Sequence, residues 1–455
     1  MEGVTLAVAA VAAVMVMAVP RRHTMVVYLA ALVWYPAYLS VPVGTVDFTV
    51  SRIVILVVLA KILLAGGAAG RFRWNWVDRL VLIAAGVECV AGLLTSESTV
   101  LLENRAGAAF DTVLVYFAVR LSVGGRRDYA ALLGGVLAVC APLAVFGAYQ
   151  CLTGSNPLGF LRAYAFSTPL ADDTALRFRH GLWRAEVTFP MPIMFGLLFA
   201  MMGPACAGLW KFAREKAAVA AGLGLMLVGM ASSLSSGPWL AGLTAGAFLA
   251  FYPLRRYWKA AILFFVVLLL AIEIGSNRHW YYVLASYGTL NPETAHYRIG
   301  LMREAFTGGM SGHWLLGYGA GAGLGGETAG WEHTDITNHY VLVLLRYGLT
   351  GLVPFLALLA AVCVRLRRAF AAAVTAAERW AVWCVLSALA GVMAAMFSVS
   401  LFGQPRTLLY VLFAFASAAG PAAGARIVAA RRPHPRPAGR EGVSREPAET
   451  GEAPR

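Results

Sequence analysis

The residues best able to do chemistry lie just before and inside an apolar segment near the C-terminal end of the chain. At 3.6 residues per turn, Asp335, His339, Leu342 and Arg346 fall on one face where the chain enters a helix near residue 338. Arg346 would lie about 12 Å along that helix, a depth at which a charge is costly and has to face a polar cavity or a partner. This pattern predicts an anion-binding cavity at one face of a membrane. An arginine that pairs with an acid only for packing, or that snorkels, is the alternative.

The start of this helix offers a candidate general base and two candidate caps. An imidazole ionises near ambient pH, so His339 could take a proton from a hydroxyl group, although it could equally be a donor that caps the helix. Thr337 or Asn338 can cap the first turn. We therefore expect the chemistry to be concentrated where the chain enters the membrane.

A second polar cluster precedes another apolar segment, in the middle of the chain. Arg177, Arg179 and Arg184 approach a helix start, and Glu186 follows. Arginine binds phosphate through two parallel hydrogen bonds, so a pair of these residues would suit a pyrophosphate. The small hydroxyl residues of Ser232–Gly242 are expected at the same face, where helix packing is their favoured role.

The composition predicts a polytopic membrane protein. The chain of 455 residues is 60% hydrophobic and 13% charged, with a mean hydropathy of +0.70, whereas soluble domains are roughly 25% charged. Apolar runs of about 20 residues recur along it, and each can span a bilayer as a helix. The predicted fold is an all-α transmembrane bundle of about twelve or thirteen spans. The spans are expected near 4–19, 24–43, 47–65, 77–95, 106–123, 129–151, 187–209, 217–233, 238–254, 259–275, 338–362, 379–400 and 406–424.

The distribution of basic residues orients the bundle. With the N-terminus outside, most of the 37 Lys and Arg residues fall in short inner loops or in the C-terminal tail. The two long loops then share the outer face, which in a bacterium is the periplasm. We see no cleavable signal peptide and expect a multi-pass protein of the bacterial inner membrane. The expected segments are N-terminal helices 1–151, a first periplasmic loop 152–186, central helices 187–275, a large periplasmic loop 276–337, C-terminal helices 338–424 and a disordered cytoplasmic tail 425–455.

Several other functions are disfavoured by the residue patterns. The net charge of +14 is explained by loop orientation, so we expect no nucleic-acid partner. The six cysteines contain no C-x-x-C pair. The glycine-rich run at 316–326 follows no predicted strand, so it indicates a flexible loop rather than a nucleotide site. Histidines are frequent nearby but lack metal-ligand spacing, and no serine-hydrolase elbow is present. We expect neither a metal nor a cofactor.

Five motifs resemble, in order, those of the O-antigen ligase and polysaccharide polymerase family. They cover roughly residues 180–360. The motifs are R-A-x-V-T-F-x-x-P-I-x-F-G (Arg184–Gly196), S-x-S-S-G-P (Ser233–Pro238), H-Y-R-x-G-L-M (His296–Met302), L-L-G-Y-G-x-G (Leu315–Gly321) and T-N-H-Y-V-L-V-L-L-R-Y-G-L-T-G-L (Thr337–Leu352).

The resemblance implies metal-independent glycosyl transfer at the periplasmic face. The donor would be a glycan linked to undecaprenyl pyrophosphate, and the acceptor would be another glycan or lipid A–core. Arg184 and Arg298 would hold the pyrophosphate, with Arg346 as a further candidate. Asn338, Tyr340 and Glu186 would support the site. Membrane lipid, a flippase and a chain-length regulator are the other partners that the resemblance suggests.

The chain departs from the family pattern at the candidate base. Ligases of the family commonly begin the late helix with His-Asn-x-Tyr, but Thr337 stands at that histidine position here and His339 is displaced by two residues. Asp335 is therefore the rival of His339. Met191 also replaces a histidine that many relatives have. These departures favour a polymerase or a divergent member over a ligase. A transporter or flippase for an anionic lipid-linked sugar is the alternative, suggested by Arg346 and Glu273 within spans.

Overall fold

The computed structural model describes most of the chain and confirms the predicted all-α membrane bundle. The described residues are 2–44, 46–65, 72–95, 99–164, 177–277, 299–301, 303–306, 310–319 and 336–418. Within them, a helix stands at every predicted span. The helices are α1 (Glu2–Ala18), α2 (Thr24–Trp34), α3 (Val50–Leu64), α4 (Trp76–Thr95), α5 (Thr99–Ser122), α6 (Arg126–Thr153), α8 (Pro192–Cys206), α9 (Lys216–Ser232), α10 (Ser236–Ala250), α11 (Trp258–Gly275), α14 (His339–Ala372), α15 (Ala376–Ala395) and α16 (Gly403–Ala418). Short 3-10 helices are η1 (Arg21–His23), η3 (Gly159–Tyr164), η4 (Ala207–Lys211) and η5 (Tyr252–Tyr257).

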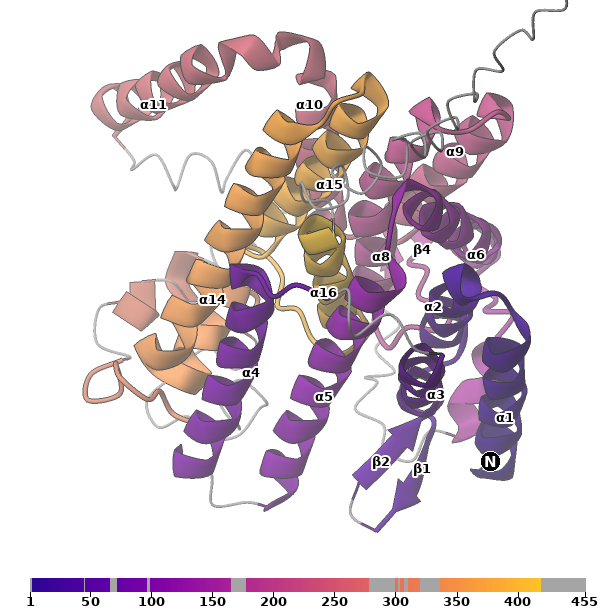
Figure 1. Cartoon of the computed structure of the whole chain (residues 1–455). Helices are drawn as coiled ribbons and strands as arrows, with labels where there is room; N and C mark the ends of the chain where they lie inside the picture. Colours follow the sequence, from indigo (N-terminus) through magenta and orange to yellow (C-terminus); the bar gives the residue numbers. More distant parts are fainter. Residues whose placement is uncertain are drawn as a thin grey trace, which may run out of the picture.

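Five helical segments of the described chain are long and apolar enough to cross a membrane. They are Arg126–Thr153, Pro192–Lys211, Tyr252–Gly275, His339–Ala372 and Ala376–Ala395. In the bundle, α4 packs along α14, α5 along α16, and α10 along α15 (Figure 1). The core between them is mainly aliphatic and aromatic, with a smaller number of buried polar and charged side chains.

A β-hairpin interrupts the second and third predicted spans, so the expected helix over 24–43 is wrong in its second half. α2 ends at Trp34, and β1 (Ser40–Val43) pairs antiparallel with β2 (Val46–Thr49). Proline lacks the N–H that a helix interior needs, so Pro36 and Pro42 cannot continue the helix. Gly44 supplies the positive φ of 66° at the turn.

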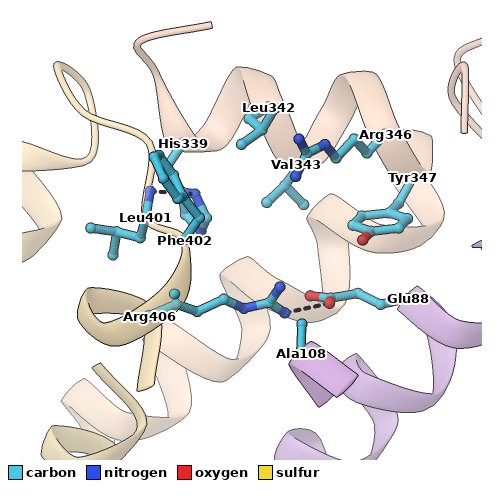
Figure 2. Close-up of a pocket in the computed structure, with 11 residues that line it drawn as sticks. Glu88, Ala108, His339, Leu342, Val343, Arg346, Tyr347, Leu401, Phe402 and Arg406 are labelled. Carbon is cyan, nitrogen blue, oxygen red and sulfur yellow. Dashed lines mark hydrogen bonds and ion pairs between the residues drawn. The ribbon is translucent and has the colours of Figure 1, made fainter. Parts of the chain in front are cut away.

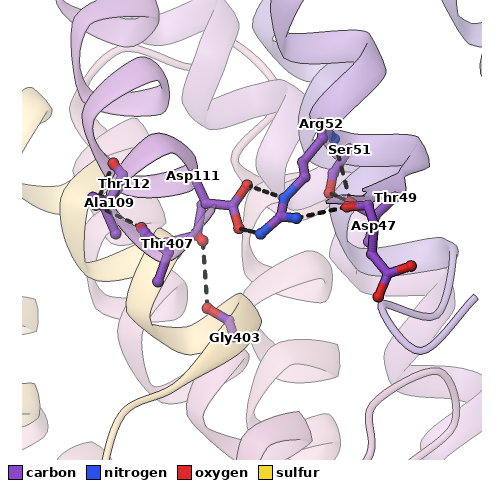
Figure 3. A network of polar contacts seen from close by, with 10 residues as sticks. Asp47, Thr49, Ser51, Arg52, Ala109, Asp111, Thr112, Gly403 and Thr407 are labelled. Carbon is purple, nitrogen blue, oxygen red and sulfur yellow. Dashed lines mark hydrogen bonds and ion pairs between the residues drawn. The ribbon is translucent and has the colours of Figure 1, made fainter. Parts of the chain in front are cut away.

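An arginine fixes this hairpin against the bundle (Figure 3). The Nε and Nη2 atoms of Arg52 each donate to the carboxylate of Asp111 at 2.9 Å, and Nη1 donates to the Asp47 carbonyl at 2.6 Å. Thr49 caps α3 through the Arg52 N–H. One side chain therefore links the hairpin, α3 and α5.

Helix α11 stands apart from the other helices (Figure 1). None of its residues is buried, and its main contact is with η5 at its own start. Residues 260–272 are apolar on every side of the helix, as expected of a helix surrounded by lipid. The predicted segments can be compared with the described residues only in part, because 165–176, 278–298, 320–335 and 419–455 lie outside them.

Candidate functional site

A cavity lies between α4, α5, α14 and the segment that leads into α16 (Figure 2). Its volume is about 130 Å³, enough for a group the size of a small ring but not for a sugar chain. Its polar lining brings together two guanidinium groups, one carboxylate, one imidazole and one phenol. The lining residues are Glu88, Ala108, His339, Leu342, Val343, Arg346, Tyr347, Leu401, Phe402, Gly403 and Arg406.

The predicted helix face is confirmed where the structure describes it. His339, Leu342 and Arg346 all line the cavity, and the exposed fractions of His339 and Arg346 are 5% and 7%. Asn338 is the N-cap of α14, where its side chain accepts hydrogen bonds from the N–H groups of Tyr340 at 3.0 Å and Val341 at 3.2 Å. The cap fixes the register from which His339 and Arg346 project.

His339 is held from both sides. The backbone N–H of His339 donates to the Met396 carbonyl at 2.8 Å. On the imidazole ring, Nδ1 accepts a hydrogen bond from the backbone N–H of Leu401 at 3.2 Å. A neutral imidazole that accepts at one nitrogen carries its proton on the other. Nε2 is therefore an N–H donor, and His339 in this arrangement has no free lone pair with which to act as a base. The prediction that His339 is the base is untested, and this geometry does not favour it.

A break in α14 at Gly348 lies directly after Arg346 and Tyr347, which line one end of the cavity. Gly348 has φ 59° and ψ −157°, which are not helical angles, so Arg346 and Tyr347 end the first part of the helix. The Leu345 carbonyl freed by the break accepts from Tyr318 N–H at 2.7 Å, and the Arg346 carbonyl accepts from Gly319 N–H at 3.2 Å. Backbone polar groups at membrane depth have to be satisfied by protein in this way.

The motif L-L-G-Y-G, interpreted from sequence as part of a flexible loop, is the segment that satisfies this break. The N–H groups of Leu349 and Thr350 donate to the carbonyls of Trp314 and Leu315 at 2.8 and 3.2 Å. A side chain on Gly317 or Gly348 would overlap with backbone atoms of the opposite segment. The two glycines therefore allow the close approach of two backbones.

The sequence reasoning missed Glu88 and Arg406. Arg406 Nη2 donates to Glu88 Oε2, which ties α16 to α4, and the two side chains are 12% and 10% exposed. In Figure 2 the pair lies opposite the face of α14 that carries His339 and Arg346. A glutamate inside the predicted span 77–95 was the available signal, because charges within spans usually mark a function or a buried partner.

Arg184 does not line the cavity; it anchors the motif S-x-S-S-G-P. Its Nη2 donates to Ser235 Oγ at 2.8 Å and its Nε to the Ser233 carbonyl at 3.4 Å. Burial, helped by the nearby charge of Arg179 and opposed by Glu186, lowers the pKa of Arg184 to about 10. Arg184 therefore stays cationic at neutral pH.

Arg184 is connected to the cavity through α10. Ser235 precedes this helix, and the space beside Gly237, in its first turn, is filled by Val399 and Ser398. The chain continues from these residues to Leu401, the donor to His339. The segment Ser398–Leu401 thus contacts both the start of α10 beside Arg184 and the His339 side of the cavity. The Arg184 guanidinium group binds Ser235 and does not line the cavity.

Glu186 is buried behind the first long loop. Its carboxylate lies 2.5 Å from Nη2 of Arg162 and 3.9 Å from Nη1 of Arg177. Its N–H donates to Gln150 at 3.1 Å. These contacts give Glu186 a structural role that holds the loop to α6.

The remaining predicted residues divide into one described side chain and two that are not described. The Tyr340 hydroxyl donates to the Met393 carbonyl at 3.0 Å, so it ties α14 to α15. Arg298 and Asp335 lie outside the described residues, and their roles stay predictions. Within the described chain, no group of three His, Cys, Asp or Glu side chains could hold a metal ion.

Removal of the Asn338 cap should loosen the site. We expect Asn338→Ala to lower the free energy of unfolding by about 1 kcal/mol, because two N–H groups of the first turn lose their acceptor. Asn338→Asp, which keeps an acceptor, should change it little. Thermal unfolding of the purified protein in detergent tests this, and an unchanged midpoint for Asn338→Ala would show that the cap contributes nothing.

Comparisons with known proteins leave the family open. No family model matches the chain, and no curated protein matches it either. Among solved structures, a chain of a peptidoglycan synthase complex, studied for its coordination of polymerization and crosslinking, is similar with a TM-score of 0.40 and 14% identity. The match covers 78% of this chain and 99% of the other. At that level of similarity, the function has to be inferred from the site itself.

Proposed function

We propose that this protein is a membrane glycan polymerase or ligase that transfers a glycan from undecaprenyl pyrophosphate to an acceptor sugar at the periplasmic face. The observation that carries the proposal is the polar cavity at the start of α14. It gathers the guanidinium groups of Arg346 and Arg406 with the Nε2–H of His339, all nearly buried. Such donors, fixed before the reaction and shielded from water, suit a leaving group that gains negative charge.

Glycosyl transfer from a lipid-linked pyrophosphate requires few catalytic groups from the protein. A glycosyl pyrophosphate already carries a good leaving group, so the enzyme chiefly has to place two substrates and stabilise the departing charge. The cavity would take one phosphate of the donor. The glycan and the polyprenyl chain would extend toward the periplasm and the lipid. The resemblance of five motifs to those of O-antigen ligases and polysaccharide polymerases supports the same reaction.

The position of basic and aromatic residues supports the proposed orientation. Basic side chains lie over aromatic rings at helix ends expected to face the cytoplasm, as with Arg255 on Tyr252 at 4.3 Å and Arg126 on Phe212 at 4.5 Å. Aromatic residues favour membrane interfaces, and basic loops favour the cytoplasm. The cavity lies along the first turns of α14, at the end of the helix opposite Arg365 and Arg368, and therefore on the periplasmic side in this orientation.

The test uses purified protein in detergent and the lipid-linked glycans extracted from a strain that lacks it. We expect the wild type to form a longer or newly attached glycan from this extract without added metal. Arg346→Ala and Arg406→Ala should each reduce the transfer and weaken the binding of farnesyl pyrophosphate, a short donor analogue. Arg214→Gln, on an exposed residue outside the site, is the matched control. Failure of the wild type to form any covalent product would refute the proposal.

A carrier for an anionic lipid-linked sugar is the second candidate. The buried charges of Arg346, Glu88 and Arg406 within the bundle favour it, because transporters also keep such groups in their pathways. Proteoliposomes separate the two functions. Movement of a labelled lipid-linked glycan across the bilayer without a new glycosidic bond would identify a carrier.

A further inference from the structure

The cavity holds a carboxylate that the proposed anion site does not need. Glu88 belongs to α4 and reaches the space between α14 and α16, where it faces the same cavity as His339 and Arg346 (Figure 2). Glu88 is only 7% exposed. Among the lining residues of the described chain, it is the one with a carboxylate. A negative charge at this position repels a phosphate, so apart from its pairing with Arg406 it does not favour anion binding.

The other titratable groups of the cavity are less suited to accept a proton. The Nδ1 lone pair of His339 is engaged by the Leu401 N–H, and protonation would place an imidazolium beside two guanidinium groups. Arg346 and Arg406 are permanent cations. Tyr347 carries a phenol, which at neutral pH already holds its proton.

We propose that Glu88 is the general base that accepts the proton of the acceptor hydroxyl, an inference that rests on the glycosyl-transfer function proposed above. The acceptor oxygen forms a bond to the anomeric carbon of the donor while the bond from that carbon to the pyrophosphate oxygen breaks. The hydroxyl proton passes to Glu88 Oε1. The electron pair of the broken bond leaves with the pyrophosphate, whose added charge is taken by Arg346 and Arg406.

The ion pair with Arg406 gives the carboxylate its direction. Arg406 Nη2 contacts Oε2, and the proposal assigns Oε1 to the hydroxyl. Because Arg406 also faces the leaving group, it contacts both the proposed base, Glu88, and the departing pyrophosphate. Protonation of Glu88 weakens its hold on Arg406 at the moment when the pyrophosphate gains charge. The rival interpretation is an ion pair that only ties α4 to α16.

Glu88→Gln separates the two interpretations because it keeps the shape and can still accept a hydrogen bond from Arg406. We expect the turnover of the extracted lipid-linked glycans to fall by about 100-fold or more, as is typical for the loss of a general base. The affinity for farnesyl pyrophosphate should not fall, since Arg346 and Arg406 are unchanged and a nearby negative charge has been removed. Glu88→Asp, which keeps a carboxylate one methylene shorter, should retain more activity than Glu88→Gln.

A second variant covers the case in which Glu88→Gln folds poorly. Glu88→Ala opens space beside Arg406, and sodium formate can supply a free carboxylate there. We expect formate to raise the residual turnover of Glu88→Ala at least about tenfold and to leave the wild type unchanged. Near wild-type turnover for Glu88→Gln, or no effect of formate on Glu88→Ala, would overturn the assignment. An inactive wild type would instead refute the proposed function, so the two failures are distinguishable.

Discussion

Arg406→Ala is expected to lower glycan transfer by about a hundredfold or more and the free energy of unfolding by about 3–5 kcal/mol. The first effect follows from its place in the cavity, where its guanidinium group faces the site of the leaving group. The second follows from its partner. Without Arg406, the carboxylate of Glu88 is left in a nearly buried position with its counter-ion removed, which is among the most costly changes a mutation can cause.

Two matched variants separate these effects. The double variant Glu88→Met with Arg406→Met replaces the pair with apolar side chains of similar size, which should restore stability but not transfer. Arg406→Lys keeps the charge but loses the planar fork, so it should be more stable than Arg406→Ala and still impaired in transfer. Thermal unfolding in detergent and the transfer assay measure the two quantities. If Arg406→Ala melts and reacts like the wild type, the pair is neither a structural tie nor part of the site.

The Glu88–Arg406 pair shows what a single sequence can and cannot predict. The two residues are 318 positions apart, and no local period relates them. By contrast, His339, Leu342 and Arg346 recur at the spacing of a helix, so their shared face could be predicted and is confirmed. Helix positions were also predictable from local sequence, because a bilayer requires long apolar runs. Contacts between helices depend on the tertiary packing, which the periodicity does not contain.

Local chemistry also explains the errors. Helix prediction failed at 35–43 and 47–49 because the apolar composition outweighed Pro36, Pro42 and Gly44, which together end a helix and start a hairpin. Arg184 stays a predicted ligand for pyrophosphate, suggested by its place in an outer loop where topology gives no reason for an arginine. In the structure it makes hydrogen bonds to Ser233 and Ser235, and the shape of the turn before α10 could not be deduced from the motif.

The break in α14 was hidden from the sequence because helical periodicity continues on both sides of it. Gly348 occurs in an apolar run that reads as one helix, and a single glycine in such a run is tolerated. Its consequence becomes clear only with the partner segment in place, where Gly317 and Leu315 approach the same backbone. The break determines where Arg346 and Tyr347 end the first half of the helix, and therefore where the cavity ends.

Gly348→Ala is accordingly expected to reduce both stability and transfer, although the residue has no side chain in the cavity. The conformation at φ 59° and ψ −157° is essentially restricted to glycine, so strain alone costs about 1–3 kcal/mol. The added Cβ would also overlap with the backbone of Leu315. To relieve the overlap, the segment Trp314–Gly319 has to move away, which leaves the Leu345 and Arg346 carbonyls without their partners.

The matched control is Gly224→Ala in α9, where the new Cβ meets no atom within 4 Å and the backbone is helical. This variant should be as stable as the wild type or slightly more stable, because alanine is the better helix former. Thermal unfolding and farnesyl pyrophosphate binding compare the two glycines. If Gly348→Ala binds and unfolds like Gly224→Ala, the break does not position Arg346. A loss of binding confined to Gly348→Ala would mean that the anion site depends on the backbone contact between two distant segments, in addition to its arginines.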